Sequence, residues 1–305
     1  MEKDKKTIRE VALVDILNKL PEIIPLNCEE DFRGDNYDLF FSALGFEERC
    51  LTIPERLSNL DDFGCKRAIY FEYSTNTDDN EVNKPRLMNA LHEFADSVDF
   101  LRCDTDDFTK NLRTILAICS TSEKIPKIML DISVCSSKLI ISIMKVFLDF
   151  DIYLEILYSE AETYHPTPEE FAEESDKWTS EGGFGIARGV GNIIPSPEYP
   201  GANRENPNII IAFPTFKPER TKAITTYIDE AITMRPGKRI IWIVGDPNMD
   251  SKARIERKKM IREINKIPED AVCYEVSTLD YKKQLRFWKV YIKIKIWTFI
   301  SIFLH

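Results

Sequence analysis

Residues 127–138 read Lys127-Ile-Met-Leu-Asp-Ile-Ser-Val-Cys-Ser-Ser-Lys138, and the residues from Leu139 to Leu148 that follow are mainly apolar. A short apolar run such as Ile128 to Ile132 is typical of a buried strand, and the longer apolar segment after it has the length of a helix. The segment therefore predicts a strand, a tight turn and a helix, which is the repeating unit of a parallel α/β sheet.

The turn between this strand and this helix carries the polar groups. Asp131 and Ser133 fall at the end of the strand, and Ser136, Ser137 and Lys138 fall in the first helical turn. Backbone N–H groups without a helical partner and the helix dipole favour an anion there. Open α/β sheets also bind ligands beyond the carboxyl ends of their strands. Two interpretations follow, a phosphate site and a plain helix cap with Asp131 stabilising the loop.

This loop resembles the ligand-binding loop of CARF-type Rossmann-like domains. The resemblance is local to residues 127–148 and rests on Asp131-Ile132-Ser133 at the strand end and on Ser137-Lys138, which match that family's Thr-Lys pair. Val134-Cys135-Ser136 stands where the family usually carries glycines. Domains of this family occur in prokaryotic antiviral systems and bind cyclic or linear oligonucleotide messengers. The resemblance thus implies a Rossmann-like fold and a nucleotide-type ligand.

Strand and helix patterns alternate on both sides of the quoted stretch. Strands are predicted at 39–44, 68–73, 98–101, 128–132 and 152–158, with helical patterns at 46–51, 85–94, 108–116 and 139–148 between them. This alternation predicts a largely parallel sheet with helices on both faces.

Further polar residues follow the other predicted strands. Glu47 and Arg49 follow the strand at 39–44, and Asn76 follows the strand at 68–73. The carboxyl ends of parallel strands meet at one edge of a sheet, so we expect Arg49 near the Asp131 loop as an anion clamp. Glu47 and Arg49 also have a plain interpretation, as charged residues in the first turn of a helix.

Glu160 and His165, after the last of these strands, are the chain's best acid–base candidates together with Tyr164. The neighbouring prolines favour a simpler interpretation, a polar loop that caps a helix beginning at Pro168.

The second half of the chain repeats the first at an offset of 171 to 173 residues. Glu219-Arg220 repeats Glu48-Arg49, and residues 238–250 align with 66–78, which places Asn248 on Asn76. Residues 277–286 align with 104–113. A slowly drifting offset predicts an internal duplication, with each copy a Rossmann-like unit.

The domain organisation follows from the repeat and from composition. We expect an accessory helix region (1–37), a first Rossmann-like domain (38–175), a Gly/Pro-rich linker or long loop (176–207) and a second, partial Rossmann-like repeat (208–305). The position equivalent to Asp131 falls at residue 304, so the second copy is expected to be incomplete and without its own ligand loop. The apolar tail from Phe287 predicts either an edge strand or a frame-shifted or truncated end, and its lysines make it a poor membrane span.

Composition narrows the function classes. The 305 residues carry a formal net charge of -10, which disfavours binding of extended duplex nucleic acid. The seven cysteines form no C-x-x-C pair and there are three histidines, so no metal site of the zinc-ribbon type is expected, and no cofactor is predicted. Scattered cysteines and an N-terminus without a signal-peptide pattern favour a cytoplasmic protein.

Our leading hypothesis is a binding module rather than an enzyme. The resemblance implies a sensor or regulatory module of a prokaryotic defence-type system. Such a module would bind a small nucleotide-type ligand and signal to an effector protein, and a homo-oligomer of this chain would be compatible with that role. The expected ligand-binding residues are Asp131, Ser133, Ser136, Ser137, Lys138, Arg49, Arg220, Asn76 and Asn248. The first alternative is a nucleotide-processing hydrolase or glycosidase that uses carboxylates on the same rim, with candidates Glu160, Glu47, Asp131 and His165. The second alternative is a non-catalytic scaffold subunit.

Overall fold

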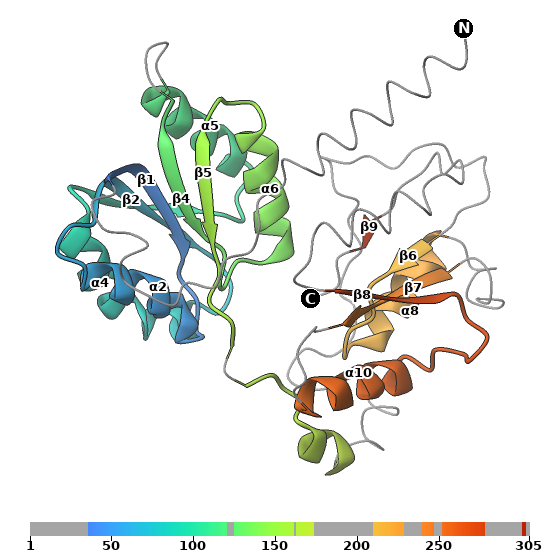
Figure 1. The fold of residues 1–305 in the computed structure, drawn as a ribbon. Helices are drawn as coiled ribbons and strands as arrows, with labels where there is room; N and C mark the ends of the chain where they lie inside the picture. Colours follow the sequence, from blue (N-terminus) through green and yellow to red (C-terminus); the bar gives the residue numbers. More distant parts are fainter. Residues whose placement is uncertain are drawn as a thin grey trace, which may run out of the picture. The chain divides into compact units, whose positions relative to one another are not determined.

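The computed structural model describes residues 36–120, 125–161, 163–173, 210–228, 240–246, 252–277 and 301–302. The chain divides into two compact units, one formed by Leu26–Glu162 and the other by the remainder of the chain. Figure 1 shows the described helices and strands of each unit. Residues 1–35 of the expected accessory helix region and the expected linker at 176–207 lie outside the described residues.

The first unit contains a five-stranded parallel sheet in the order β3-β2-β1-β4-β5. Its strands are β1 (Asn36–Ala43), β2 (Gly64–Glu72), β3 (Val98–Arg102), β4 (Lys127–Asp131) and β5 (Tyr153–Leu157). Its helices are α2 (Arg49–Ser58), α3 (Thr77–Glu81), α4 (Lys84–Phe94), α5 (Phe108–Cys119) and α6 (Ser137–Phe147). The predicted Rossmann-like α/β fold is confirmed.

Strand β1 is the central strand, and all of its residues except Asn36 are buried. Successive strand side chains point to opposite faces. Phe40 therefore packs in one apolar cluster with residues of α2 and α4, whereas Leu39 and Phe41 pack in another with residues of α5 and α6. Figure 1 shows these helix pairs on the two faces of the sheet. The first unit thus has three layers, helices, sheet and helices.

The order of strands reverses between β1 and β4. From β1 the chain moves to β2 and β3 on one side, and β4 then returns to the other side of β1 and is followed by β5. This is the topological switch point, beyond whose carboxyl ends open α/β sheets bind their ligands. The loop after β1, which ends at Arg49, and the loop after β4, which begins after Asp131, both lie there.

The second unit repeats this topology. Strands β6 (Ile210–Ala212), β7 (Ile240–Asp246), β8 (Cys273–Ser277) and β9 (Ser301–Ile302) form a parallel sheet in the order β8-β7-β6-β9, with helices α8 (Pro218–Ile228) and α10 (Lys252–Ile264). Leu39 pairs with Ile128 in the first sheet, and Ile211, 172 positions after Leu39, pairs with Ser301, 173 positions after Ile128. The offset seen in the sequence is therefore also present in the strand pairing.

One element of the first unit escaped the sequence analysis. The polar run after β2 contains the short helix α3, which has Asp78 and Asp79 in its first turn, where the helix dipole favours acidic residues. Residues 168–173 are helical, as predicted from Pro168. No helix in the described part of the chain is long and apolar enough to cross a membrane.

Candidate functional site

The loop between β4 and α6 is held by a buried polar network. Asp131 is only 2% exposed, and its Oδ1 accepts hydrogen bonds from the backbone N–H of Ser133, at 2.8 Å, and from the Ser133 hydroxyl group. The Ser133 hydroxyl in turn accepts a 2.8 Å hydrogen bond from the backbone N–H of Ser159, which follows β5. Asp131 and Ser133 thus join the ends of β4 and β5.

Burial changes the acidity of Asp131. Removal from water raises the pKa of this carboxyl from 3.8 to about 6, although the hydrogen bonds from Ser133 and the charge of Arg49 act in the opposite direction. A carboxyl group that titrates near neutral pH at the edge of a sheet is a candidate for acid–base chemistry.

The start of α6 shows which of the predicted residues remain available. Ser136 is the N-cap, since its Oγ accepts a 3.2 Å hydrogen bond from the backbone N–H of Leu139, and the helix-cap prediction is confirmed for this residue. The Oγ of Ser137 is buried and has no hydrogen-bond partner in the described part of the chain. Lys138 is exposed, and no described carboxylate lies at ion-pairing distance from it. A hydroxyl and an ammonium group are therefore left for a ligand.

Arg49 lies beside this loop, at the start of α2. Its Nε forms a 2.6 Å ion pair with Oε2 of Glu47. Burial alone would lower the pKa of Arg49, but Glu47 and Tyr158 raise it above its ordinary value. The structure therefore brings Glu47, Arg49, Tyr158 and Asp131 together beyond the carboxyl ends of β1, β4 and β5.

The space directly between the two loops is filled by Val134. A Cβ atom on Gly45, in the loop after β1, would lie 3.2 Å from Cγ2 of Val134. The carbonyl of Gly45 also accepts hydrogen bonds from Asn83 Nδ2 at 2.9 Å and from Cys50 Sγ at 3.4 Å, which fix this backbone. Any ligand on this rim therefore lies to the side of the Gly45–Val134 contact rather than between the two strands.

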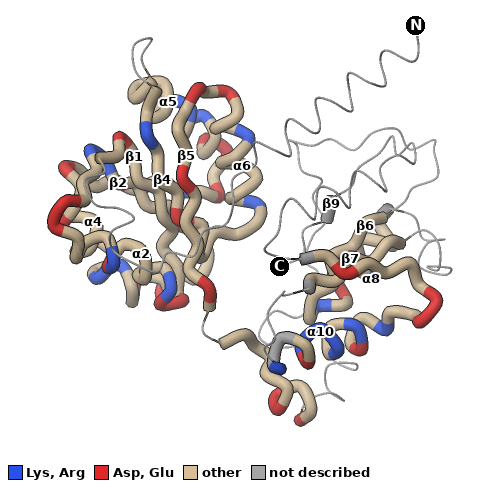
Figure 2. The backbone as a smooth tube through the Cα atoms, in the orientation of Figure 1, with Lys and Arg blue, Asp and Glu red and all other residues tan. Residues whose placement is uncertain are grey.

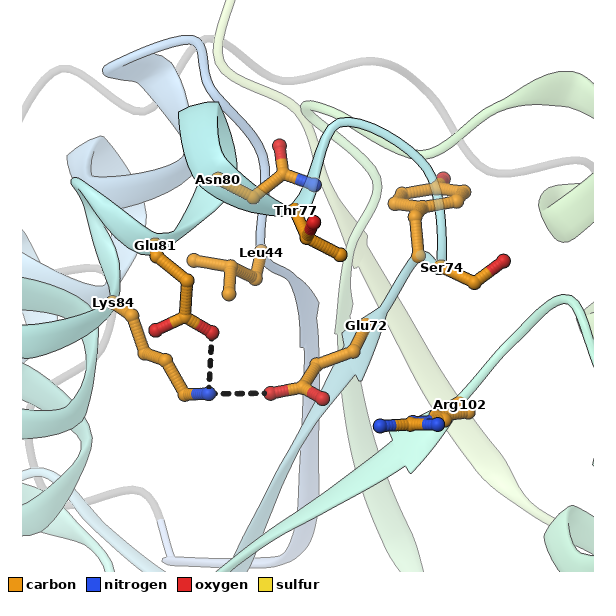
Figure 3. Close-up of a pocket in the computed structure, with 9 residues that line it drawn as sticks. Leu44, Glu72, Ser74, Thr77, Asn80, Glu81, Lys84 and Arg102 are labelled. Atoms are coloured by element: carbon orange, nitrogen blue, oxygen red, sulfur yellow. Dashed lines mark hydrogen bonds and ion pairs between the residues drawn. The ribbon is translucent and has the colours of Figure 1, made fainter.

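A cavity of about 240 Å³ lies on the same rim of the first sheet. It is lined by Leu44 after β1, by residues at the ends of β2 and β3, and by residues of α3 and α4 (Figure 3). The charged lining residues are Glu72, Glu81, Lys84 and Arg102. These residues were not predicted from the sequence, in which the one signal is the long polar run after β2.

Tyr73 connects the cavity to the β4–α6 loop. Its side chain lines the cavity, and its hydroxyl group accepts a 2.8 Å hydrogen bond from the backbone N–H of Ser136. Asn76, predicted to bind ligand, lies nearby in the chain with a left-handed backbone (φ 55°) and precedes α3, but it does not line the cavity. The cavity and the start of α6 are thus two neighbouring parts of one rim.

The remaining predicted site residues are Glu160, in the first unit, and His165, Arg220 and Asn248, in the second. Glu160 is exposed after β5. His165 belongs to the second unit, where its Nδ1 lies 2.9 Å from Oε2 of Glu170, and Arg220 lies in α8 of that unit. Asn248 lies outside the described residues. The expectation that His165, Arg220 and Asn248 share the rim with Asp131 stays a prediction.

Figure 2 shows Asp and Glu residues interspersed with Lys and Arg over the described elements of the first unit. Within the described residues, no group of three His, Cys, Asp or Glu side chains could hold a metal ion. No protein-family model matches the chain, and no curated protein matches it. A functional assignment therefore depends on the fold and on the chemistry of the rim.

Proposed function

We propose that the first unit is a binding module for a nucleotide-type ligand whose phosphate group lies at the first turn of α6. The observation that carries this proposal is the buried Oγ of Ser137, which has no hydrogen-bond partner in the described part of the chain, beside the exposed ammonium group of Lys138. A buried hydroxyl group that lacks a partner costs about 1–3 kcal/mol, and a phosphate oxygen would supply that partner.

The local backbone supports the same assignment. The first N–H groups of a helix have no intrahelical acceptor, and Ser136 satisfies only that of Leu139. The N–H groups of Ser137 and Lys138 would bind phosphate oxygens together with the dipole of α6. Arg49, which is already paired with Glu47, would add positive potential rather than a direct contact.

A sensor role is favoured over catalysis because the acidic groups of the rim are engaged. Asp131 accepts the hydrogen bonds of Ser133, and Glu47 is paired with Arg49. By the resemblance of residues 127–148 to CARF-type domains, the module would belong to a prokaryotic defence-type system and would signal to an effector protein.

One observation favours the alternative of a nucleotide-processing hydrolase. Asp131 has a pKa of about 6 and lies within electrostatic reach of Arg49, and such a carboxyl group is able to accept or donate a proton at neutral pH. The experiment below therefore also tests whether Asp131 takes part in catalysis.

The experiment is a thermal-shift screen of the full chain against mononucleotides, dinucleotides and cyclic oligonucleotides. A ligand that binds only the folded protein at a hundredfold excess over its Kd adds about 2.7 kcal/mol of stability. We expect a rise in Tm that is lost in Lys138→Ala and reduced in Ser137→Ala. Lys145→Ala is the matched control, because it lies in the last turn of α6, where the helix dipole disfavours anions.

Two results would overturn the proposal. One is the absence of a shift with every probe, and the other is an equal shift in the Lys138→Ala and Lys145→Ala proteins. Chromatography of the bound ligand separates the sensor from the hydrolase. Recovery of unchanged ligand supports the sensor, whereas turnover that is lost in Asp131→Asn supports the hydrolase.

A further inference from the structure

The cavity of about 240 Å³ beside Tyr73 is separate from the first turn of α6, and the phosphate proposal does not use it. Its position beyond the carboxyl ends of β1, β2 and β3 is on the rim where parallel sheets bind ligands. The charges that line it are arranged in two parts, an ion-pair cluster and an arginine that forms no ion pair in the described part of the chain.

The first part is an ion-pair cluster around Lys84. The Nζ of Lys84 lies 2.8 Å from Oε1 of Glu81 and 3.0 Å from Oε1 of Glu72 (Figure 3). The hydrogen bonds from Lys84 to Glu81 and Glu72 raise the pKa of Lys84 above its ordinary value, so the ammonium group stays charged. Two carboxylates with one shared cation leave this side of the cavity with an excess of hydrogen-bond acceptors.

The other part is Arg102, at the end of β3. It is exposed, and in the described part of the chain no carboxylate lies at ion-pairing distance from its guanidinium group. Figure 3 shows this guanidinium group pointing from β3 toward the side of the cavity that Glu72 occupies. Acceptors and donors thus face the same space, too far apart to pair with each other.

The charge balance selects the chemical class of the occupant. Two Glu, one Lys and one Arg sum to zero, so a free anion would be repelled by Glu72 and Glu81, and a cation would be repelled by Lys84. Hydroxyl groups both donate and accept hydrogen bonds, so neighbouring hydroxyls can satisfy a carboxylate and a guanidinium group together. A volume of about 240 Å³ equals the share of roughly eight water molecules in the liquid, which leaves room for one sugar ring.

We propose that this cavity binds a sugar ring through two adjacent hydroxyl groups, one donating to Glu72 and the other accepting from Arg102. The proposal rests on the proposed function, since the sugar would be that of the nucleotide whose phosphate lies at α6. Thr77 and Asn80, which also line the cavity, supply further polar groups around the ring.

The test uses the full chain and ligand-observed NMR titrations. The probes are the four ribonucleoside 5′-monophosphates, their 2′,3′-dideoxy counterparts and the free ribonucleosides. Loss of hydrogen bonds to charged groups should weaken binding of the dideoxy compounds by about tenfold or more. Arg102→Gln and Glu72→Gln should lower the affinity for the ribose form to that of the dideoxy form, and Arg113→Gln, an exposed arginine of α5, should change neither.

The outcomes separate this inference from the proposed function. If ribose and dideoxy forms bind equally and both are lost in Lys138→Ala, the sugar site is overturned and the phosphate site stands. If free ribonucleosides bind and Lys138→Ala has no effect on any probe, the sugar site stands and the phosphate site is overturned. Binding of no probe overturns both.

Two further results bear on the sugar site. Inorganic phosphate that displaces the nucleosides and loses this ability in Arg102→Gln would identify an anion pocket and overturn the sugar site. If Glu72→Gln fails to fold by circular dichroism, Arg102→Gln alone gives the answer, because no ion pair in the described part of the chain depends on Arg102.

Discussion

The hydroxyl group of Tyr73, at the end of β2, accepts a 2.8 Å hydrogen bond from the backbone N–H of Ser136, the N-cap of α6. The same side chain forms part of the cavity wall. Tyr73 therefore contacts both the cavity and the start of α6, and a change in its position would alter both. Burial raises the pKa of Tyr73 to about 12, so the hydroxyl group is neutral at physiological pH.

Replacement of Tyr73 by Phe removes the acceptor for the Ser136 N–H. We expect the free energy of unfolding of the first unit to fall by about 1 kcal/mol, the usual net value of one hydrogen bond, with faster hydrogen exchange at the start of α6. Tyr153→Phe is the matched control, because Tyr153 is exposed on β5. Equal exchange at the start of α6 in the two variants would contradict the role given to Tyr73.

Asp131→Asn tests the buried carboxyl group through pH. The folded state raises the pKa of Asp131 from 3.8 to about 6, so the folded protein binds the proton more tightly than the unfolded chain does. The wild type should therefore lose stability relative to Asp131→Asn as the pH rises from about 4 to about 6, by about 3 kcal/mol in all, and the difference should be constant above that interval.

The stability of the first unit can be followed by hydrogen exchange of peptides from β1 between pH 4 and pH 8. Asp78→Asn, on the exposed surface of α3, serves as the control, because it keeps Asp131 and its curve should follow that of the wild type. If the wild type and Asp131→Asn gave parallel curves over the whole range, the raised pKa would be wrong.

Gly45→Ala tests the contact at the switch point. The new methyl group would lie 3.2 Å from Cγ2 and 3.3 Å from Cβ of Val134, and the hydrogen bonds to the Gly45 carbonyl resist movement of the backbone. We expect a loss of about 1–3 kcal/mol in the free energy of unfolding, measured by urea denaturation. The double variant Gly45→Ala/Val134→Ala should recover part of that loss, and an absence of recovery would argue against a steric cause.

Arg257→Lys tests a contact within the second unit. The guanidinium group of Arg257, on α10, donates hydrogen bonds to the carbonyl groups of Tyr164 at 3.1 Å, His165 at 2.9 Å and Pro166 at 2.9 Å. It also lies 4.4 Å from the ring centroid of Phe216. An ammonium group cannot donate to all three carbonyl groups in the geometry of the planar guanidinium group. We therefore expect the free energy of unfolding of the second unit to fall by about 2 kcal/mol.

Tryptophan fluorescence isolates this effect, because all four tryptophans of the chain, residues 178, 242, 288 and 297, belong to the second unit. Lys259→Ala, an exposed change on the same helix, is the control and should leave the urea midpoint unchanged. Identical midpoints for Arg257→Lys and the wild type would show that the three carbonyl contacts add no net stability.

The fold could be predicted from the sequence because its strands and helices produce local patterns of apolar residues. Apolar runs of strand length at 39–44 and 128–132 correspond to β1 and β4, and a drifting repeat offset anticipated the second sheet. Helix α3 was missed because it is short and polar and is held by its packing beside α4 rather than by an apolar face of its own.

Only part of the candidate site could be predicted from the sequence. The loop from Asp131 to Lys138 could be found because a strand end, hydroxyl residues and a helix start follow one another in the chain. The cavity could not be found in this way, because Glu72, Lys84 and Arg102 come from three separate elements and their pairing depends on tertiary packing. The plain interpretation, in which Asp131 stabilises its own loop, agrees with the hydrogen bond that Asp131 accepts from the backbone N–H of Ser133, two positions later.

The strand order imposes a delay during synthesis of the chain, because β1 must wait for β4. Strand β1 lies at the centre of its sheet, yet the partner of Leu39 on one side is Ile128, 89 positions later in the chain. At a synthesis rate of about 5–20 residues per second, the ribosome needs roughly 5 to 20 seconds to deliver that partner. For that interval Leu39, Phe40 and Phe41, each fully buried in the finished protein, belong to a strand with one open edge. The nascent chain is therefore most in need of a chaperone before β4 leaves the ribosome.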